Sequence, residues 1–253
     1  MGGLTTLEGS VVLVTGGSGD IGRAVCVELA RAGADVAFTY FRDRAAADET
    51  VSLVEAAGRR AVVVKAHLGD ADAAERVVTA TVTAFGRLDH LVSNAASGVL
   101  RPAIALDAKH FDWTMGVNAR ALLLLVRAAE PHFHAGSGVV ALTSIGSTRV
   151  IPDYTAVGAS KAALEALVRY LAVELGPKDI RVNAVSPGVV DTKALRHFPG
   201  RDAMLAEGLA GTPAGRLVCP QDVALAVRFL LSDDAWMIRG HTLVVDGGAA
   251  LPA

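Results

Sequence analysis

Tyr154 and Lys161 are the two residues whose types and spacing point most directly to chemistry. Residues seven apart on a helix differ by only about 20° in direction, so a helix would turn both side chains toward one cleft. A phenol in such a cleft can donate a hydrogen bond to an oxygen that gains negative charge in a transition state. The alternative is that Tyr154 is a packed aromatic residue at the start of a helix and Lys161 is a solvated charge.

A glycine-rich run, Thr15 to Gly22, follows a short apolar segment and opens into an amphipathic stretch. Glycines there let the backbone approach a pyrophosphate, and a helix N-terminus offers it free N–H donors and partial positive charge. This strand–turn–helix context favours dinucleotide binding over the alternative, a plain tight turn.

Arg42 and Arg44 come directly after the second predicted strand, where NAD(H)-binding proteins carry a carboxylate for the ribose 2′-hydroxyl. Position 40, at the tip of that strand, is Tyr40. The arginines favour a 2′-phosphate, and hence NADPH over NADH. Solvated charge at the start of a helix is the alternative.

Short β-branched runs alternate with longer amphipathic segments along the chain, which is typical of βαβ units. The predicted strands are Val11–Thr15, Asp35–Tyr40, Ala61–Lys65, Leu88–Ser93, Gly138–Thr143, Arg181–Val185 and Thr242–Val245. Their continuous apolar character indicates burial on both faces of a parallel sheet, which requires helices on both sides.

The intervening segments supply the helices. They are predicted near Ile21–Ala32, Asp43–Ala57, Asp72–Phe85, Asp107–His134, Tyr154–Leu175 and Gln221–Leu231. Right-handed crossovers would join all elements into one α/β domain, residues 1–253, with a doubly wound, Rossmann-like sheet of seven parallel strands. Residues 191–220, long and rich in glycine and proline, do not follow the alternation, and such a loop is usually functional, often a lid.

Composition narrows the classes of partner. The 253 residues carry 24 Lys and Arg against 26 Asp and Glu, a balance without a basic run that favours neither nucleic acid nor a membrane surface. The longest apolar stretch, Ala121–Val126, falls far short of the ~20 residues that span a bilayer. The N-terminus resembles no secretory signal, so we expect a cytoplasmic protein. Cys26 and Cys219 lack a CxxC or His-rich context, so no metal site is predicted.

Motifs in chain order resemble those of the short-chain dehydrogenase/reductase family over nearly the whole sequence. They are Thr15 to Gly22, Ser93-Asn94-Ala95-Ala96, Asn118, Thr143-Ser144, Lys161, Ser186-Pro187-Gly188 and Val245-Asp246-Gly247-Gly248. The resemblance implies an NAD(P)H-dependent oxidoreductase whose cofactor lies at the carboxyl ends of the strands.

The resemblance also implies roles for individual residues. Catalytic roles fall to Tyr154, Lys161, Ser144 and Asn118. Lys161 would bind the nicotinamide-ribose hydroxyls and lower the pKa of Tyr154 by its charge. Ser144 would donate to the substrate carbonyl or merely cap the fifth strand, and Asn118 would hold a water path to the lysine or be a buried structural residue. The implied cofactor contacts are Gly16, Ser18, Gly19, Ile21, Arg42, His67, Leu68, Asn94, Lys161, Val189 and Thr192.

Two positions near the cofactor depart from the family pattern. Asp20 replaces the middle glycine of the first motif, which puts a carboxylate near the expected pyrophosphate and lowers affinity unless it points away as a helix cap. His67 replaces an aspartate that contacts adenine in the family. A lone histidine in a loop is more often a surface residue than a ligand contact.

A third departure concerns the phenol. The commonest branch of the family has tyrosine four residues before the lysine, but that position is Val157, and Tyr154 is separated from Lys161 by six residues. This spacing, together with the segments 94–102 and 112–115, is similar to that of NADPH-dependent type III enoyl-acyl-carrier-protein reductases. The resemblance implies reduction of the 2,3 double bond of an enoyl thioester, linked to a carrier protein or coenzyme A, in fatty-acid or polyketide-type metabolism.

The spacing suits that reaction. In conjugate reduction hydride goes to C3 while charge builds on the thioester oxygen three bonds away, and a phenol displaced by one helical turn could follow that oxygen. Two other activities stay open. A 3-ketoacyl-thioester reductase would share Ser144 and Asn118, and a non-catalytic dinucleotide sensor would have no need of both Tyr154 and Lys161.

The resemblance implies a homotetramer that packs through the fourth and fifth helices and the C-terminal strand. The apolar runs Ala121–Val126 and Leu164–Leu171 fit this, unless they form the chain's own core. In the predicted lid, apolar residues would line a tunnel for the acyl chain: Leu195, Phe198, Met204, Leu205 and Leu209. Its basic residues, Lys193, Arg196, Arg201 and Arg216, would meet a phosphopantetheine phosphate or an acidic acyl carrier protein, or simply solvate the loop.

Overall fold

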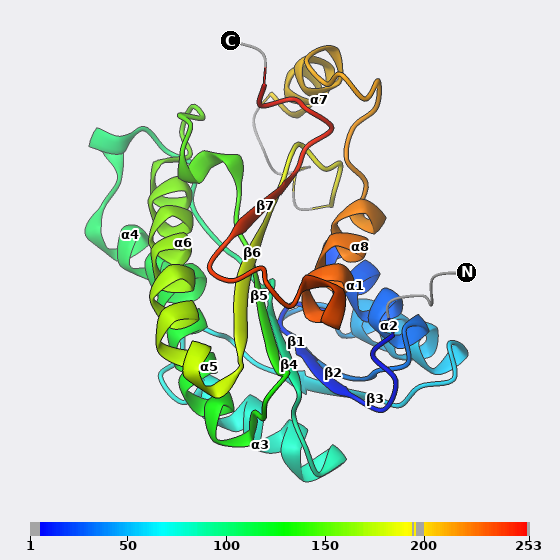
Figure 1. The fold of residues 1–253 in the computed structure, drawn as a ribbon. Helices are drawn as coiled ribbons and strands as arrows, with labels where there is room; N and C mark the ends of the chain where they lie inside the picture. The colour runs from blue at the N-terminus through cyan, green and yellow to red at the C-terminus, as the bar shows by residue number, and fades with distance from the viewer. Residues whose placement is uncertain (1–5, 194, 196–199, 252–253) are drawn as a thin grey trace.

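A parallel sheet with helices on both faces forms the centre of the molecule (Figure 1). The computed structural model describes residues 6–193, 195 and 200–251. The strands are β1 (Val11–Val14), β2 (Asp35–Tyr40), β3 (Ala61–Lys65), β4 (His90–Ser93), β5 (Gly138–Leu142), β6 (Arg181–Pro187) and β7 (Thr242–Val245). They follow the order β3-β2-β1-β4-β5-β6-β7, and all neighbours are parallel. The predicted doubly wound α/β fold is confirmed.

Two layers of helices cover this sheet. On one face lie α1 (Asp20–Arg31), α2 (Arg44–Ala56) and α8 (Pro220–Leu231); on the other lie α3 (Ala73–Phe85), α4 (Ala108–Met115), α5 (Ala121–Ala129) and α6 (Thr155–Leu175) (Figure 1). Successive residues of β1 show why both layers are needed, because Val12 and Leu13 join different core clusters on opposite faces. Burying each such side chain contributes about 1.5–3 kcal/mol.

The long helix predicted for residues 107–134 is interrupted. A π-helical turn, Gly116–Arg120, separates α4 from α5, and a 3₁₀ turn, Glu130–His132, follows. A π turn accommodates one residue more than an α turn and occurs frequently at functional sites. Here it contains Asn118, which is 1% exposed and uses its amide to bind another segment.

Residues 191–220 are not one irregular loop, as the sequence suggested. They contain α7 (Arg201–Ala210), which lies beyond the carboxyl ends of β6 and β7 (Figure 1). Two of the glycines that made this segment resemble a loop lie at the helix boundaries, since Gly200 precedes α7 with φ 73° and Gly211 follows it. Of the predicted tunnel and phosphate contacts, Phe198 and Arg196 lie outside the described residues.

Candidate active site

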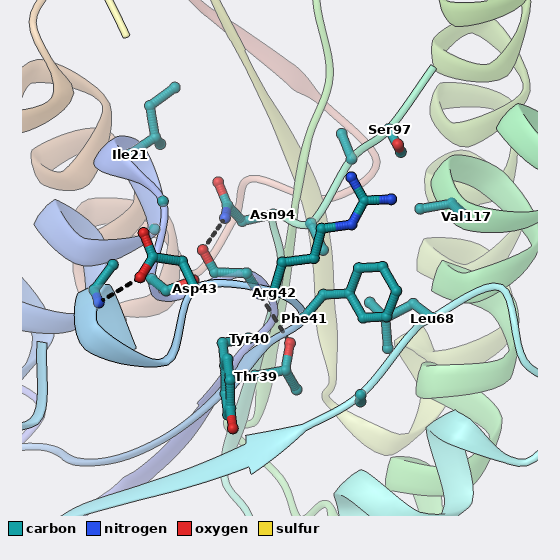
Figure 2. Close-up of a pocket in the computed structure, with 18 of the residues that line it drawn as sticks. Ile21, Thr39, Tyr40, Phe41, Arg42, Asp43, Leu68, Asn94, Ser97 and Val117 are labelled. Carbon is teal, nitrogen blue, oxygen red and sulfur yellow. Dashed lines mark hydrogen bonds between the residues drawn. The ribbon is translucent and has the colours of Figure 1, made fainter. Parts of the chain in front are cut away.

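A cavity of about 580 Å³ opens at the carboxyl ends of β1, β2 and β4 (Figure 2). It lies where the strand order reverses, between β1 and β4, which is where open α/β sheets bind ligands. Nine predicted cofactor contacts line it: Gly16, Ser18, Gly19, Ile21, Arg42, His67, Leu68, Asn94 and Thr192. The described lining does not include Lys161 or Val189, and Val189 lies against Gly208 of α7.

The glycine-rich loop, which follows β1, is held by the ends of the two strands on either side of β1, β2 and β4. The Thr39 hydroxyl accepts from the N–H of Gly16 at 2.9 Å, and the Asn94 amide donates to the Gly16 carbonyl at 3.2 Å (Figure 2). Gly16 has φ 71°, and a Cβ there would lie 3.0 Å from the Asn94 amide nitrogen, so only glycine allows this close approach. Gly19 is the N-cap of α1, and no side chain accepts a hydrogen bond from the first N–H groups of the helix at this cap. These N–H groups are therefore available to an anion.

Tyr154 is hydrogen-bonded to the Ser144 side chain. The phenol residue is the N-cap of α6 rather than part of the helix, and its ring lies close enough to Gly146 that a Cβ at that glycine would come within 2.7 Å of ring atoms. Burial raises the pKa of Tyr154, and the bond to Ser144 only partly opposes this. The predicted lowering of that pKa by Lys161 is therefore wrong, because loss of solvation dominates. The phenol keeps its proton and can act as a donor.

Lys161, in the second turn of α6, is buried and its Nζ donates to the Leu142 carbonyl at 2.7 Å. Burial lowers the pKa of Lys161 to about 8, while the charge of Glu165 acts in the opposite direction. Glu165 lies one helical turn further on, is itself buried, and accepts from the Thr143 hydroxyl at 2.7 Å. Sequence reasoning missed Glu165, although its spacing of four from Lys161 is the signal of a shared helix face.

Asn118 joins the loop after β4 to α6. Its Oδ1 accepts from the Ser97 N–H at 2.8 Å, and its Nδ2 donates to the Ser97 carbonyl and to the Ser160 hydroxyl, each at 2.9 Å. Ser160 immediately precedes Lys161, so Asn118 ties the loop after β4 to the helix that carries the lysine. Both Nδ2 hydrogens are thereby used within the protein. The water path to Lys161 stays a prediction.

The comparisons with known proteins agree with this arrangement. The family model described as Enoyl-(Acyl carrier protein) reductase matches residues 17–250. The crystal structure of a short chain dehydrogenase from Burkholderia cenocepacia J2315 in complex with NADP superimposes with a TM-score of 0.89 at 37% identity, covering 96% of this chain and 98% of that one. The chain belongs to the short-chain dehydrogenase/reductase family. It is therefore an oxidoreductase.

Curated relatives in this family differ in the substrates that their names give. The 1-cyclohexenylcarbonyl-CoA reductase of Streptomyces collinus is 38% identical over 245 residues, which cover 96% of this chain and 88% of the relative. The hydroxynaphthalene reductase arp2 of Aspergillus fumigatus is 35% identical over 246 residues, 93% of this chain and 90% of the relative. Similarity alone therefore does not choose the substrate of this short-chain dehydrogenase/reductase.

At the far end of the cavity, the two arginines expected to recognise a 2′-phosphate behave differently. Arg42 lines the cavity and its guanidinium carbon lies 5.2 Å from the centroid of the Phe41 ring (Figure 2). Arg44 instead donates to Asp48 at 2.8 Å and lies over Tyr40, and it is not among the described lining residues. The expectation of a phosphate contact therefore rests on Arg42.

His67, expected most often at the surface, forms part of the cavity wall. Its ring lies 4.7 Å from that of Phe41, its Nδ1 lies 3.0 Å from an Asp70 oxygen, and its Nε2 accepts from the Trp113 indole N–H at 3.4 Å. An acceptor at Nε2 and a carboxylate at Nδ1 are consistent with the neutral tautomer protonated at Nδ1. Trp113 also lines the cavity, so it forms part of the pocket wall.

Asp20 does not cap its helix. Its carboxylate accepts from the backbone N–H of Lys193 at 2.5 Å, which joins the first turn of α1 to the segment after β6. Both residues line the cavity. The carboxylate therefore stays next to the expected pyrophosphate, contrary to the idea that it turns away as a cap.

Groups for metal or redox chemistry are not gathered in the parts of the chain that the structure describes. Within residues 6–193, 195 and 200–251, no three His, Cys, Asp or Glu side chains are placed to hold a metal ion. Cys26 is buried, which raises its pKa far above the usual range, and Cys219 is exposed; both are free thiols. No helix in these ranges is both long and apolar enough to cross a bilayer.

Proposed function

We propose that this chain is an NADPH-dependent enoyl-thioester reductase, which reduces the 2,3 double bond of an enoyl group linked to coenzyme A or an acyl carrier protein. The observation that carries the proposal is the place of the phenol: Tyr154 is bonded to Ser144 near the end of β5, whereas position 157 is a valine. The name of the Streptomyces collinus relative and the description of the family model support it.

Val157 provides no hydrogen-bond donor at this position. It is 7% exposed, and its Cγ2 lies 2.3 Å from where a Cβ at Gly98 would stand, so the loop after β4 covers this position closely. A carbonyl reductase of the commonest branch needs its phenol there, beside the nicotinamide. In this chain that point is apolar and closely covered, and the proton donor is displaced to the start of α6.

The lining of the cavity suits the adenosine and diphosphate parts of a dinucleotide, because the glycine-rich loop and the uncapped start of α1 would receive the diphosphate and Arg42 the 2′-phosphate. Lys161, which is outside the described lining, would bind the nicotinamide-ribose hydroxyls. Thr192 would steady the diphosphate or the carboxamide. Bound NADPH supplies the hydride. The similar short chain dehydrogenase from Burkholderia cenocepacia was crystallised in complex with NADP, which supports this choice of cofactor over NADH.

The chain's own residues then have separate tasks. Tyr154, whose pKa is raised further above neutral pH by the loss of solvation, donates a hydrogen bond to the thioester oxygen as that oxygen gains charge. Ser144 fixes the phenol from the rigid end of β5. The proton that completes the reduction reaches C2 from Tyr154 or from water.

Two of the basic residues that were predicted to bind the phosphopantetheine arm or the acyl carrier protein are paired with carboxylates of this chain. Arg201 forms ion pairs with Asp191 and Asp202, and Arg216 pairs with Asp222, whose pKa is lowered by that contact. These two guanidinium charges are already matched within the chain. A phosphopantetheine or acidic carrier protein would therefore have to compete with internal carboxylates at both positions.

A 3-ketoacyl-thioester reductase is the second candidate, because Ser144 and Asn118 are present and arp2 of Aspergillus fumigatus is named as a hydroxynaphthalene reductase. The test compares kcat/KM for crotonyl and acetoacetyl thioesters of coenzyme A and of acyl carrier protein with NADPH. We expect a higher kcat/KM for the crotonyl thioester than for the acetoacetyl thioester on either carrier. A preference for the ketone across chain lengths would overturn the proposal, and turnover of neither substrate would favour a non-catalytic sensor.

A further inference from the structure

We propose that Asp20 is a positioning residue: it fastens residues 191–193 to the first turn of α1 and so holds Thr192 in the cofactor cavity. The inference rests on the proposed function only in that Thr192 is taken to contact the cofactor. The proposal assigns a role to the carboxylate at position 20, where the family pattern has a glycine.

The contact spans the two sides of the cavity. Asp20 lies in the first turn of α1, and its Oδ2 accepts from the Lys193 N–H, 173 residues further along the chain, at 2.5 Å. Asp20, Thr192 and Lys193 line the same cavity. A second hollow of about 370 Å³ lies beside it, lined by these three residues with Arg23, Asp191 and Pro220. The Asp20–Lys193 contact therefore lies in the wall that the two cavities share.

Thr192 is held by contacts on both of its neighbours. Asp191 receives two hydrogen bonds from the Arg201 guanidinium of α7, at 2.8 and 3.0 Å. Before it, Val190 forms a parallel bridge with Val218. After it, the Lys193 N–H is bound by Asp20. The first two contacts fix the segment toward α7 and α8, and Asp20 alone among these partners ties it to the glycine-rich loop.

Charge and hydrogen bonding act in opposite senses at this position. The negative carboxylate opposes an incoming diphosphate, whereas its oxygen accepts a charge-assisted hydrogen bond that orders the backbone of Lys193. Substitutions can separate the two effects. Asp20→Asn removes the charge and keeps an acceptor oxygen, while Asp20→Gly removes both and restores the family residue.

The experiment measures amide exchange at Lys193 in the cofactor-free protein, NADPH dissociation constants and kcat for wild type and both variants. We expect Asp20→Gly to speed Lys193 exchange by about 10- to 100-fold, the range of a lost charge-assisted hydrogen bond, and to lower kcat several-fold. Asp20→Asn should keep most of the protection and of kcat and should bind NADPH more tightly. Asp43→Asn is the matched control, since Asp43 lines the same cavity but accepts from Ala46. It should leave Lys193 exchange unchanged.

A double-mutant cycle with Thr192→Val tests whether Asp20 acts through that residue. If it does, Asp20→Gly should change NADPH affinity far less in the Thr192→Val background than in wild type. Independent, multiplying effects, or unchanged Lys193 exchange in Asp20→Gly, would overturn the inference. Exchange and cofactor binding do not depend on which thioester is reduced, so these outcomes are distinct from a failure of the proposed reaction.

Discussion

The Ser144 hydroxyl and the Tyr154 phenol are hydrogen-bonded to each other although they belong to different elements. Ser144 follows the end of β5 by two residues and also accepts from the Gly146 N–H at 3.2 Å. Tyr154 starts α6. The donor pair is therefore positioned by a buried strand on one side and a long helix on the other, which suits a group whose direction must be fixed before charge develops.

Tyr154→Phe should lower kcat by about 10²–10³, the usual cost of losing one oxyanion donor, while the NADPH dissociation constant stays unchanged. Ser144→Ala should have a smaller effect, because the phenol remains but loses its partner. Steady-state kinetics on the enoyl thioester and a fluorescence titration with NADPH measure the two quantities. A larger loss in Ser144→Ala than in Tyr154→Phe would give the serine the main role.

Lys161 should give NADPH binding an alkaline limit. Its pKa is lowered to about 8, so the ammonium is present below that pH and lost as pH rises through it, whereas the raised pKa of Tyr154 keeps the phenol protonated. Affinity for NADPH should therefore fall above about pH 8. Glu165→Gln should move this limit to lower pH, because the carboxylate supports the ammonium. Dissociation constants measured across the pH range test this.

Controls for the alkaline limit come from the same helix and strand. Thr143→Val removes the hydrogen bond to Glu165 but leaves its charge, so it should shift the limit less than Glu165→Gln. Other charges on the elements around α6 are engaged elsewhere: Arg120 donates to Gly69, and Arg181 donates to the carbonyls at the end of α8. Lys161→Ala should weaken NADPH binding at all pH values. If it kept the same pH dependence, another group would be titrating.

Arg42→Ala should weaken NADPH binding by about tenfold or more and leave NADH nearly unaffected, since one charge-assisted phosphate contact contributes roughly 1.5–3 kcal/mol. Arg44→Ala is the matched control, because Arg44 is paired with Asp48 and is not among the described residues that line the cavity. It should change neither affinity appreciably. Equal losses for the two cofactors in Arg42→Ala would remove the assignment of the 2′-phosphate site.

We expect a homotetramer in solution, and the structure changes the residues on which this expectation rests. Most side chains of the two apolar runs face the chain's own core, as Leu122 and Leu164 do. The apolar surface left on these helices is that of Leu123, Tyr170 and Val173, with Tyr170 76% and Val173 79% exposed. Light scattering should give four times 26.0 kDa. A Tyr170→Glu variant should dissociate, and a wild-type monomer would contradict the prediction.

Residues 191–220 should close over the cofactor and the acyl chain. α7 has no buried residue in the described part of the chain, so its packing leaves room for movement. Amide exchange in 200–220 should slow when NADPH and a substrate analogue are both present. Exchange that is the same with and without these ligands would show that α7 is a fixed wall.

The fold was predictable because its signals are local. Each apolar run of the sheet lies between turn residues, and a run such as Val11–Val14 is buried on both faces most readily inside a parallel sheet. The cofactor loop was predictable for the same reason, since glycines, strand and helix are contiguous. Nine expected cofactor contacts accordingly line one cavity.

Long-range contacts are what the sequence could not reveal. The hydrogen bond from the Lys193 N–H to Asp20 joins residues that are 173 positions apart, and no sequence pattern near either residue predicts it. The direction of the Tyr154 pKa shift depends on burial by packing, which spacing along a helix does not report. The sequence does not distinguish Arg44 from Arg42 as a phosphate contact, whereas in the structure Arg44 is paired with Asp48 and lies over Tyr40.

Because of the π turn at Gly116–Arg120, the geometry of the candidate active site depends on the number of residues in this part of the chain. Removing one residue from an ordinary helix rotates everything beyond it by about 100° and breaks its packing. Here a one-residue deletion would instead allow α4 and α5 to join as a regular α-helix with Leu122 and Leu125 still facing the core. The loss would fall on Asn118 and its bonds to Ser97. A shorter chain would thus have a more regular helix and a less well-supported Lys161.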